Sequence, residues 1–248
     1  MTYIAILAAF SLCTISLVNG QGRDREGLDP EVTEVWKLVD KVTPAETVGN
    51  APSDAVVLFD GSSLDAWIHL DGSAAKWDVA DGAFMVKKGT GDIKTKETFG
   101  DIQLHIEWMA PTDVAGTGQD QGNSGIYLQE RYEIQVLDSY TTETYANGQA
   151  GSIYKQHPPL VNANRPPLTW QAYDIVYRAP VFNDEGKLLV PARMTAFLNG
   201  ILVQDNTSIW GPTEYRGLPV YVEHGNASLK LQDHDNPVKF RNIWVRGL

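Results

Sequence analysis

Short runs of alternating apolar and polar residues, separated by turn residues, fill the chain from Ala55 onward. In DIQLHIEWM (101–109), isoleucine, leucine and tryptophan alternate with glutamine, histidine and glutamate. A period of two is typical of a strand with one face in the core. Asp81-Gly82 lies between two such runs, and Asn199-Gly200 is the strongest hairpin signal. The pattern predicts an all-β domain over 55–248, built as a jelly-roll sandwich of two antiparallel sheets.

A different pattern precedes this domain. The sequence Asp-Pro-Glu at 29–31 offers an N-cap, a proline at the first helical position and an acid in the first turn. Apolar residues then recur at helical spacing as far as Val39, which predicts one short helix at about 30 to 40. The remaining residues of the 21–54 segment indicate a polar lead-in and a loop.

The first twenty residues are typical of a secretory signal peptide. Ile4 to Val18 is almost unbroken apolar, although no lysine or arginine precedes Arg23, and an N-terminal anchor is the main alternative. The run is short for a membrane span, and no second apolar run follows it. We therefore expect an exported protein, periplasmic or extracellular, without stable membrane insertion after cleavage at about residue 20.

Composition narrows the candidate chemistry. Cys13 is the only cysteine and lies in the predicted signal peptide, so the mature chain would have no disulfide, thiolate zinc site or cysteine nucleophile. The formal net charge of -11 argues against nucleic acid and anionic membranes as partners. Neutral or cationic ligands remain, and the sequence does not indicate the oligomeric state.

Carboxylates and tyrosines occupy strand-like positions in NSGIYLQERYEIQVLDSY (123–140). The strand period places Glu133 and Gln135 on one face, with Cα atoms roughly 6.6 Å apart. Asp138 has the wrong parity for that face unless the strand bulges or ends, and Glu130 fits a turn between two strands.

A polar strand face flanked by aromatic loops is a common way to bind sugar, because hydroxyls meet amides and carboxylates while apolar sugar faces meet rings. The long loop 139–169 is rich in tyrosine, which favours an ordered wall of a cleft over disorder. For each tyrosine, packing at the sheet margin is the alternative. The candidate carbohydrate-binding residues are Asn123, Tyr127, Gln135, Tyr140, Tyr154, Gln232 and Arg241.

His234 lies between two aspartates near the C-terminus, where it fits a general base, a metal ligand or a turn residue. The other histidines lack zinc-site spacing, and the Asp/Gly/Asn-rich loop at 113–123 is only a weak calcium signal. A divalent metal ion is thus left open as a cofactor. No serine-hydrolase elbow or phosphate-binding glycine loop occurs.

Several stretches together resemble the bacterial 3-keto-disaccharide hydrolase family: VLFDGSSLDAW, LHIEWM, GNSGIYLQERYEIQVLDSY, GQAGSIYKQHPPLVNANRPPLTWQAYDIVYRAP and LQDHDNPVKFRNIWVRGL. The resemblance runs in order from about Val56 to Leu248. It implies a concanavalin-like jelly roll, export, and action on glycosides whose 3-hydroxyl is oxidised to a ketone.

By position, the family's motif acids, amide, histidine and arginine fall on Glu107, Glu133, Gln135, Asp138, His234 and Arg241. The family usually has glycine where this chain has Asp235, and glycine suggests a left-handed backbone, which Asp tolerates better than most residues.

A ketone at C3 acidifies the C2 proton, so a base can remove it, the enolate can expel the C1 substituent, and water can add back. This hypothesis gives Glu133 or His234 as the base, Arg241 or a metal ion as the enolate stabiliser, and Glu107 or Asp138 as a second acid/base.

Two other functions remain. A retaining glycosidase would need a second carboxylate on the strand face, and Gln135 stands there as an amide. A non-catalytic, lectin-like glycan-binding module would use the same fold without chemistry.

Overall fold

The computed structural model describes residues 29–112 and 114–248. The predicted signal peptide, 1–20, lies outside these residues. The chain divides into two compact units, Met1–Lys41 and Val42–Leu248.

The described part of the first unit contains one 3-10 turn, η1 (Pro30–Thr33). The N-cap prediction is confirmed, because Asp29 Oδ1 accepts from the Glu31 backbone N–H at 3.1 Å. The predicted continuation to residue 40 is wrong, since Glu34 has an extended backbone. Trp36 is 92% exposed. A short helix gains most of its stability by burying an apolar face, and the apolar side chains of this segment are exposed.

The second unit contains an eight-stranded sheet. Its strands are β1 (Val56–Phe59), β3 (Asp78–Ala80), β4 (Ala83–Met85), β6 (Ile102–Met109), β9 (Gln171–Arg178), β12 (Arg193–Leu198), β13 (Ile201–Ser208) and β15 (Lys239–Gly247). They pair in the order β13-β12-β9-β6-β15-β4-β3, and β1 pairs with β15.

A five-stranded sheet forms the second layer, in the order β2-β5-β14-β7-β8. Its strands are β2 (Trp67–His69), β5 (Ile93–Thr95), β7 (Ser124–Leu128), β8 (Tyr132–Val136) and β14 (Lys230–Leu231). The remaining elements are a two-stranded hairpin and two 3-10 turns: β10 (Val181–Phe182), β11 (Leu188–Val190), η2 (Gly118–Asp120) and η3 (Ala146–Gly148).

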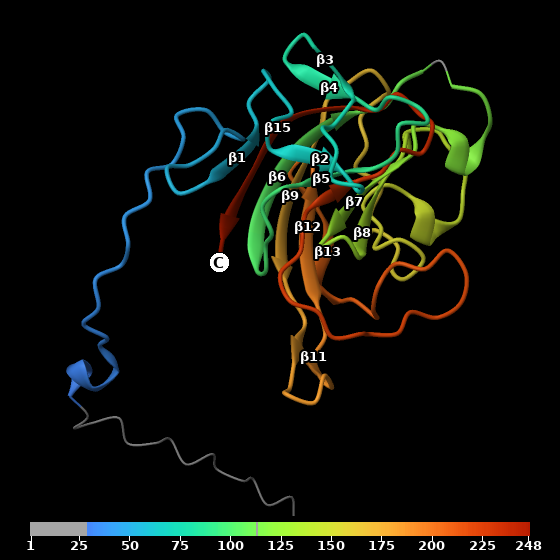
Figure 1. Cartoon of the computed structure of the whole chain (residues 1–248). Helices are drawn as coiled ribbons and strands as arrows, with labels where there is room; N and C mark the ends of the chain where they lie inside the picture. Colours follow the sequence, from blue (N-terminus) through green and yellow to red (C-terminus); the bar gives the residue numbers. More distant parts are fainter. Residues whose placement is uncertain (1–28, 113) are drawn as a thin grey trace, which may run out of the picture. The chain divides into compact units, whose positions relative to one another are not determined.

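The two sheets pack face to face around one core (Figure 1). Alternate residues of the longer strands enter this core, such as Ile106 of β6 and Ile134 of β8, both 0% exposed. Tyr173 of β9 also crosses the core, where its hydroxyl donates to Gln135 O of β8 at 2.7 Å. The strand pairs are antiparallel, so the predicted all-β jelly-roll sandwich is confirmed.

Two-residue turns with a left-handed backbone connect β3 to β4 and β12 to β13. Asp81-Gly82 and Asn199-Gly200 have positive φ at both positions, as predicted for type I′ turns. The connection between β7 and β8 has three residues, 129–131, and no glycine, yet Gln129 and Glu130 also have positive φ, of 50° and 61°. The Gln129 amide offsets this strain through buried hydrogen bonds to Phe99 O and the Tyr177 hydroxyl. Glu130 thus lies in the predicted turn.

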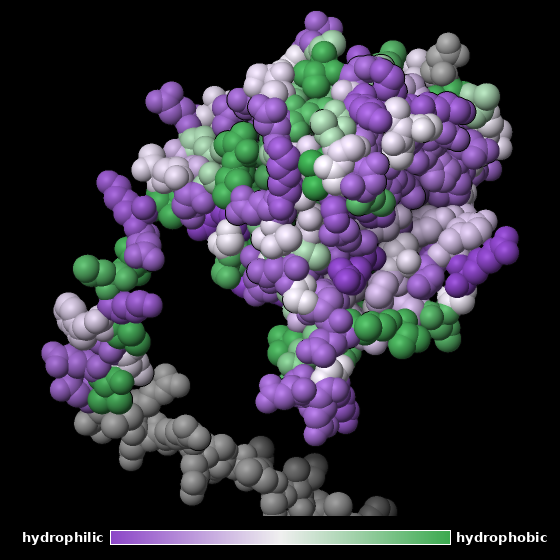
Figure 2. Space-filling model, viewed as in Figure 1, coloured by the Kyte–Doolittle hydropathy of each residue, from purple (hydrophilic) through white to green (hydrophobic). Residues whose placement is uncertain are grey.

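The face of the second unit seen in Figure 2 is mainly hydrophilic, in keeping with the acidic composition. Exposed apolar residues occur in β11 and in the loop after β13, including Leu189, Leu218 and Val220. No helix in the described part of the chain is both long enough and apolar enough to span a membrane.

Candidate active site

A cavity of about 540 Å³ lies on the outer face of the five-stranded sheet. Strands β7 and β8 form its floor, and the segments before β7, after β8, after β13 and after β14 form its walls. Its lining residues are Gln119, Asp120, Asn123, Tyr127, Glu133, Gln135, Tyr145, Tyr154, Thr213, Tyr215, Gln232 and His234.

The floor follows from the alternation of side chains in β8. Tyr132, Ile134 and Val136 belong to the buried core, so Glu133 and Gln135 point to the opposite face and line the cavity. Tyr127 of β7 pairs directly with Glu133, which brings the two side chains together. The predicted pairing of Glu133 with Gln135 on the outer face is therefore present.

The Glu133 carboxyl is buried, and one of its two oxygens lacks a hydrogen-bond partner in the described part of the chain. The residue is 2% exposed, and its Oε2 has no hydrogen-bond partner among the described residues. Burial raises the pKa of Glu133, and the Tyr127 hydroxyl and Lys230 only partly offset this, so that the pKa is about 8. A buried polar atom that faces a cavity without a partner is a strong sign of a ligand-binding group.

Gly125 allows Glu133 and Tyr127 to lie so close together. It pairs with Gln135 in the sheet. A Cβ at this position would lie 2.5 Å from Glu133 Oε1 and 2.7 Å from Tyr127 Cε2. Glycine is therefore required here by space and not by backbone dihedrals.

Tyrosines form one wall of the cavity. The hydroxyls of Tyr145 and Tyr154 lie 2.6 Å apart, and the ammonium of Lys155 lies 4.4 Å from the centre of the Tyr145 ring. The same ammonium lies 5.2 Å from the Tyr215 ring, which joins two loops distant in sequence. The wall is also tied to the floor, because Tyr154 N–H donates to Glu133 O. Two residues of the 139–169 loop thus contribute to a wall of the cavity, as predicted.

His234 lies at the exposed edge of the cavity. The next residue, Asp235, has a φ of 62°, which confirms the predicted left-handed backbone where the family usually has glycine. The turn is anchored by Asn236, whose side chain donates to His234 O and accepts from Gly122 N–H. His234 is therefore a turn residue, which was one of its three predicted roles. The turn places its imidazole beside the cavity.

Most of the predicted site residues meet in this cavity. Those that line it are Asn123, Tyr127, Glu133, Gln135, Tyr154, Gln232 and His234. Four others, Glu107, Asp138, Tyr140 and Arg241, do not line it.

Asp138 and Tyr140 follow the end of β8 at Val136. Asp138 Oδ1 accepts from the Tyr140 backbone N–H at 3.2 Å, so its carboxylate stabilises the turn that leaves the sheet. Tyr140 is 50% exposed. The structure thus gives both residues a place in the turn, and the predicted acid/base role of Asp138 has no geometric support.

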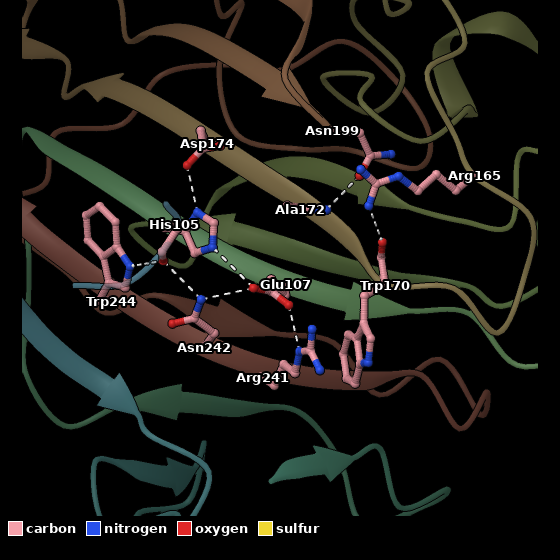
Figure 3. Close-up of polar contacts among 11 residues, drawn as sticks. His105, Glu107, Arg165, Trp170, Ala172, Asp174, Asn199, Arg241, Asn242 and Trp244 are labelled. Atoms are coloured by element: carbon pink, nitrogen blue, oxygen red, sulfur yellow. Dashed lines mark hydrogen bonds and ion pairs between the residues drawn. The ribbon is translucent and has the colours of Figure 1, made fainter. Parts of the chain in front are cut away.

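Glu107 and Arg241 lie side by side on the outer face of the other sheet (Figure 3). The core lies between this face and Glu133. Arg241 Nε donates to Glu107 Oε2 at 2.6 Å, and Asn242 Nδ2 donates to Glu107 Oε1 at 2.9 Å. The Arg241 guanidinium also stacks on the Trp170 ring at 4.0 Å. The prediction that Glu107 and Arg241 act together with Glu133 is not supported, because side chains on opposite outer faces cannot meet one substrate ring.

His105 is the buried centre of the same outer cluster. It is 3% exposed, stacks on Trp244, and forms ion pairs with Asp174 at 2.7 Å and with Glu107 at 3.7 Å. Burial lowers the pKa of His105, but the hydrogen bond to Asp174, the nearby Glu107 carboxylate and the charges of both carboxylates outweigh it and raise the pKa to about 9. For Glu107, burial raises the pKa, and the hydrogen bonds from its partners outweigh this and lower it to about 2.

The His105 ion pairs predict a pH-dependent stability. Because the pKa of His105 is raised in the folded state, its ion pairs contribute fully to the free energy of unfolding below about pH 6.5. This contribution is lost as pH rises through about 9. Between pH 6 and pH 9.5, we expect the free energy of unfolding to fall by as much as about 3 kcal/mol more in the wild type than in His105→Gln, as measured by urea unfolding. The comparison cancels the contribution of Glu133, which both proteins share. Equal losses in the two proteins would contradict the assignment.

Glu107→Gln separates this cluster from the cavity. Removing the charge weakens the bonds to Arg241 and His105, so we expect the free energy of unfolding to fall by about 2 kcal/mol. Turnover should stay within a few-fold of wild type, because Glu107 lies outside the cavity. A hundredfold loss of turnover at unchanged stability would instead return Glu107 to the mechanism.

Sequence reasoning missed several lining residues. Gln119 and Asp120 lie in the polar loop 113–122, which suggested only a weak cation signal. Thr213 and Tyr215 come from the loop after β13, where no sequence signal marked them. Thr213 Oγ1 accepts from the Glu133 backbone N–H at 3.0 Å, a contact that only the folded chain creates.

A metal centre has little support from side-chain placement. Across 29–112 and 114–248, no three His, Cys, Asp or Glu side chains gather in an arrangement that could hold a metal ion. The donors in the cavity, including Asp120, Glu133 and His234, do not form such a group. Turnover with and without a chelator is therefore the measurement that decides whether the reaction needs a metal.

Two solved structures share the fold of this chain. A crystal structure from Parabacteroides distasonis ATCC 8503, described as a "putative glycosyl hydrolase", is 49% identical, with a TM-score of 0.85, and covers 90% of this chain and 98% of its own. A second structure from that organism, with the same description, is 20% identical, with a TM-score of 0.56, and shares the fold over 79% of this chain and 94% of its own.

No curated protein matched the sequence. The family described as "3-keto-alpha-glucoside-1,2-lyase-like domain" matches residues 54–246, which include every residue that lines the cavity and both sheets except the last residue of β15. The chain therefore belongs to this family.

Proposed function

We propose that this protein is a carbohydrate-active enzyme that cleaves glycosides carrying a ketone at C3 of the sugar. The observation that carries the proposal is the buried Glu133 carboxyl, with one oxygen unpaired, in a cavity walled by tyrosines and amides. Family membership supports the 3-keto substrate class. Tyrosine rings suit the apolar faces of a sugar, and the amides of Asn123 and Gln232 suit its hydroxyls.

The ketone defines the chemistry that the cavity has to supply. It acidifies the C2 proton, so a base removes that proton, and the enolate then expels the oxygen at C1. Water adds to the resulting enone to complete hydrolysis. The reaction needs a base at C2, donors to the enolate oxygen and a proton for the leaving oxygen.

Groups of each kind line the cavity. His234 and Glu133 supply the two acid/base side chains. Burial raises the pKa of the Tyr127 and Tyr154 hydroxyls far above neutrality, so both remain protonated and can donate to an enolate oxygen. Arg241 cannot take the stabilising role that was expected of it, because it lies on the other outer face.

A hydrolase acting on unoxidised glycosides is a second candidate, because Asp120 brings another carboxylate to the cavity besides Glu133. The same cavity would also serve a binding module without catalysis. Substrate choice and the fate of the C2 hydrogen separate these functions.

The test uses the purified protein in D₂O with a 3-keto-glucoside and with the matching unoxidised glucoside, each with and without chelator. We expect aglycone release only from the ketone, with deuterium appearing at C2 of the product. Cleavage of the unoxidised glucoside without C2 exchange would favour the glycosidase. Binding without turnover of either compound would favour the module, and loss of turnover with chelator would reveal a metal requirement.

A further inference from the structure

A chain of side-chain amides runs from the backbone at Gly148 to Glu133. Gln119 Nε2 donates to Gly148 O at 2.9 Å and to Thr144 Oγ1 at 3.1 Å. A backbone carbonyl can only accept, so this contact fixes the nitrogen end of the Gln119 amide. Its oxygen therefore faces Gln135.

The orientation of Gln119 sets the orientation of Gln135. Gln135 Nε2 donates to Gln119 Oε1 at 2.9 Å, which leaves the Gln135 amide oxygen 3.0 Å from Glu133 Oε1. Two oxygens at this distance form a hydrogen bond only if one of them carries a proton. An amide oxygen carries none, so in this orientation of Gln135 the proton lies on Glu133.

The reversed Gln135 amide would suit an ionised Glu133, because its nitrogen would donate to Glu133 Oε1 at 3.0 Å and to Ser124 O at 3.1 Å. Its oxygen, however, would then face Gln119 Oε1 at 2.9 Å. Reversing the Gln119 amide would remove that contact. It would also turn the Gln119 amide oxygen toward Gly148 O, which cannot donate. Each arrangement leaves one contact between two oxygens: the Gln135 amide oxygen meets Ser124 O when Glu133 is protonated, and it meets Gln119 Oε1 when Glu133 is ionised and Gln135 is reversed. The burial of Glu133, which is 2% exposed, favours the first arrangement, because a neutral carboxyl loses less hydration than a carboxylate.

The other groups around Glu133 come from several elements. The titratable and charged residues that face it or share its cavity are Asp92, Asp120, Tyr127, Tyr145, Tyr154, Tyr215, Lys230 and His234. Lys230 is held by Asp92 at 3.0 Å and lies over the Tyr127 ring at 3.7 Å, so its charge is already paired. Burial and this paired cation agree with a neutral Glu133.

We infer that Glu133 enters the reaction as a proton donor and that Gln119 and Gln135 are positioning residues that hold its proton in place. This inference rests on the proposed function for its chemical role. It leaves His234 as the base of the cavity.

The proton balance closes over one cycle. His234 takes the C2 proton, the C1–O bond breaks, and Glu133 gives its proton to the departing oxygen. In the second half, the Glu133 carboxylate takes a proton from water as the hydroxyl adds to C1, and His234 returns its proton to C2. Both groups end as they began, and one water is consumed.

The test observes Glu133 without substrate. The full chain is labelled with ¹³C at the glutamate side-chain carboxyl, and Glu133 is assigned by difference from Glu133→Gln. We expect a neutral carboxyl at pH 6.5. In Gln119→Leu, Gln135 is free to reverse and donate to the carboxylate, so the apparent pKa of Glu133 should fall by about one unit, a tenfold change in acidity. Gln149→Leu removes an amide that is not hydrogen-bonded to Gln119, Gln135 or Glu133, and it should leave the apparent pKa of Glu133 unchanged.

A Glu133 carboxylate at pH 6.5 in the wild type would overturn the inference, as would an unchanged titration in Gln119→Leu. If Glu133→Gln fails to fold, the signal that shifts in Gln119→Leu but not in Gln149→Leu gives the assignment. A neutral Glu133 in a protein that does not turn over a 3-keto-glucoside would refute the proposed function and leave the proton placement standing. With turnover present, the fall of kcat on the alkaline side should move to lower pH in Gln119→Leu.

Discussion

Glu133→Gln is expected to reduce kcat on a 3-keto-glucoside by on the order of a thousandfold, within the range that acid/base side chains contribute. The amide keeps the size and polarity of the carboxyl but cannot transfer a proton, so KM should change little. Steady-state release of the aglycone measures both constants.

Glu130→Gln is the matched control, because Glu130 lies three residues earlier in the β7–β8 turn and pairs with Lys94 outside the cavity. Its kcat should remain near that of the wild type. If Glu133→Gln released aglycone at the wild-type rate, Glu133 would have no part in the chemistry.

Gly125→Ala should be the next most damaging change. The added methyl group would lie within 3 Å of Glu133 Oε1 and Tyr127 Cε2, so one of these side chains has to move. Misplacing a reacting group by about 1 Å can reduce the rate on the order of a hundredfold, and overpacking costs about 1–3 kcal/mol. Kinetics together with urea unfolding would separate the two effects.

Gly247→Ala is the control for this substitution, because a Cβ at Gly247 meets nothing within 4 Å. It should leave kcat unchanged. A Gly125→Ala protein with wild-type kcat would show that Glu133 and Tyr127 can work from other positions.

The sequence was most informative where local geometry decides the outcome. The strand period correctly placed Glu133 and Gln135 on one outer face, and positive φ at Asp235 was expected because the family that the sequence resembles usually has glycine there. Alternation does not reveal which sheet a strand joins. Glu107 and Glu133 both occupy polar strand faces, yet β6 and β8 belong to different sheets, so the two carboxylates end on opposite sides of the core.

Loop paths and burial explain the other differences. Thr213 and Tyr215 reach the cavity because the loop after β13 returns to β8, where Thr213 N–H donates to Arg131 O. That contact joins residues far apart in the sequence and has no local pattern. The apolar spacing before Val39 also resembled a helix, but helical spacing alone does not supply a surface against which a helix can pack.

β8 is the outermost strand of its sheet, and unpaired strand edges invite association between molecules. Here the segment 151–154 covers that edge: Gln135 N–H donates to Ser152 O, and Gly151 N–H and Tyr154 N–H donate to Gln135 O and Glu133 O. The backbone bonds that place Tyr154 beside Glu133 thus also protect the strand from edge-to-edge aggregation. These bonds do not depend on side-chain identity, so the residue at 154 can vary to suit a different sugar without exposing the edge.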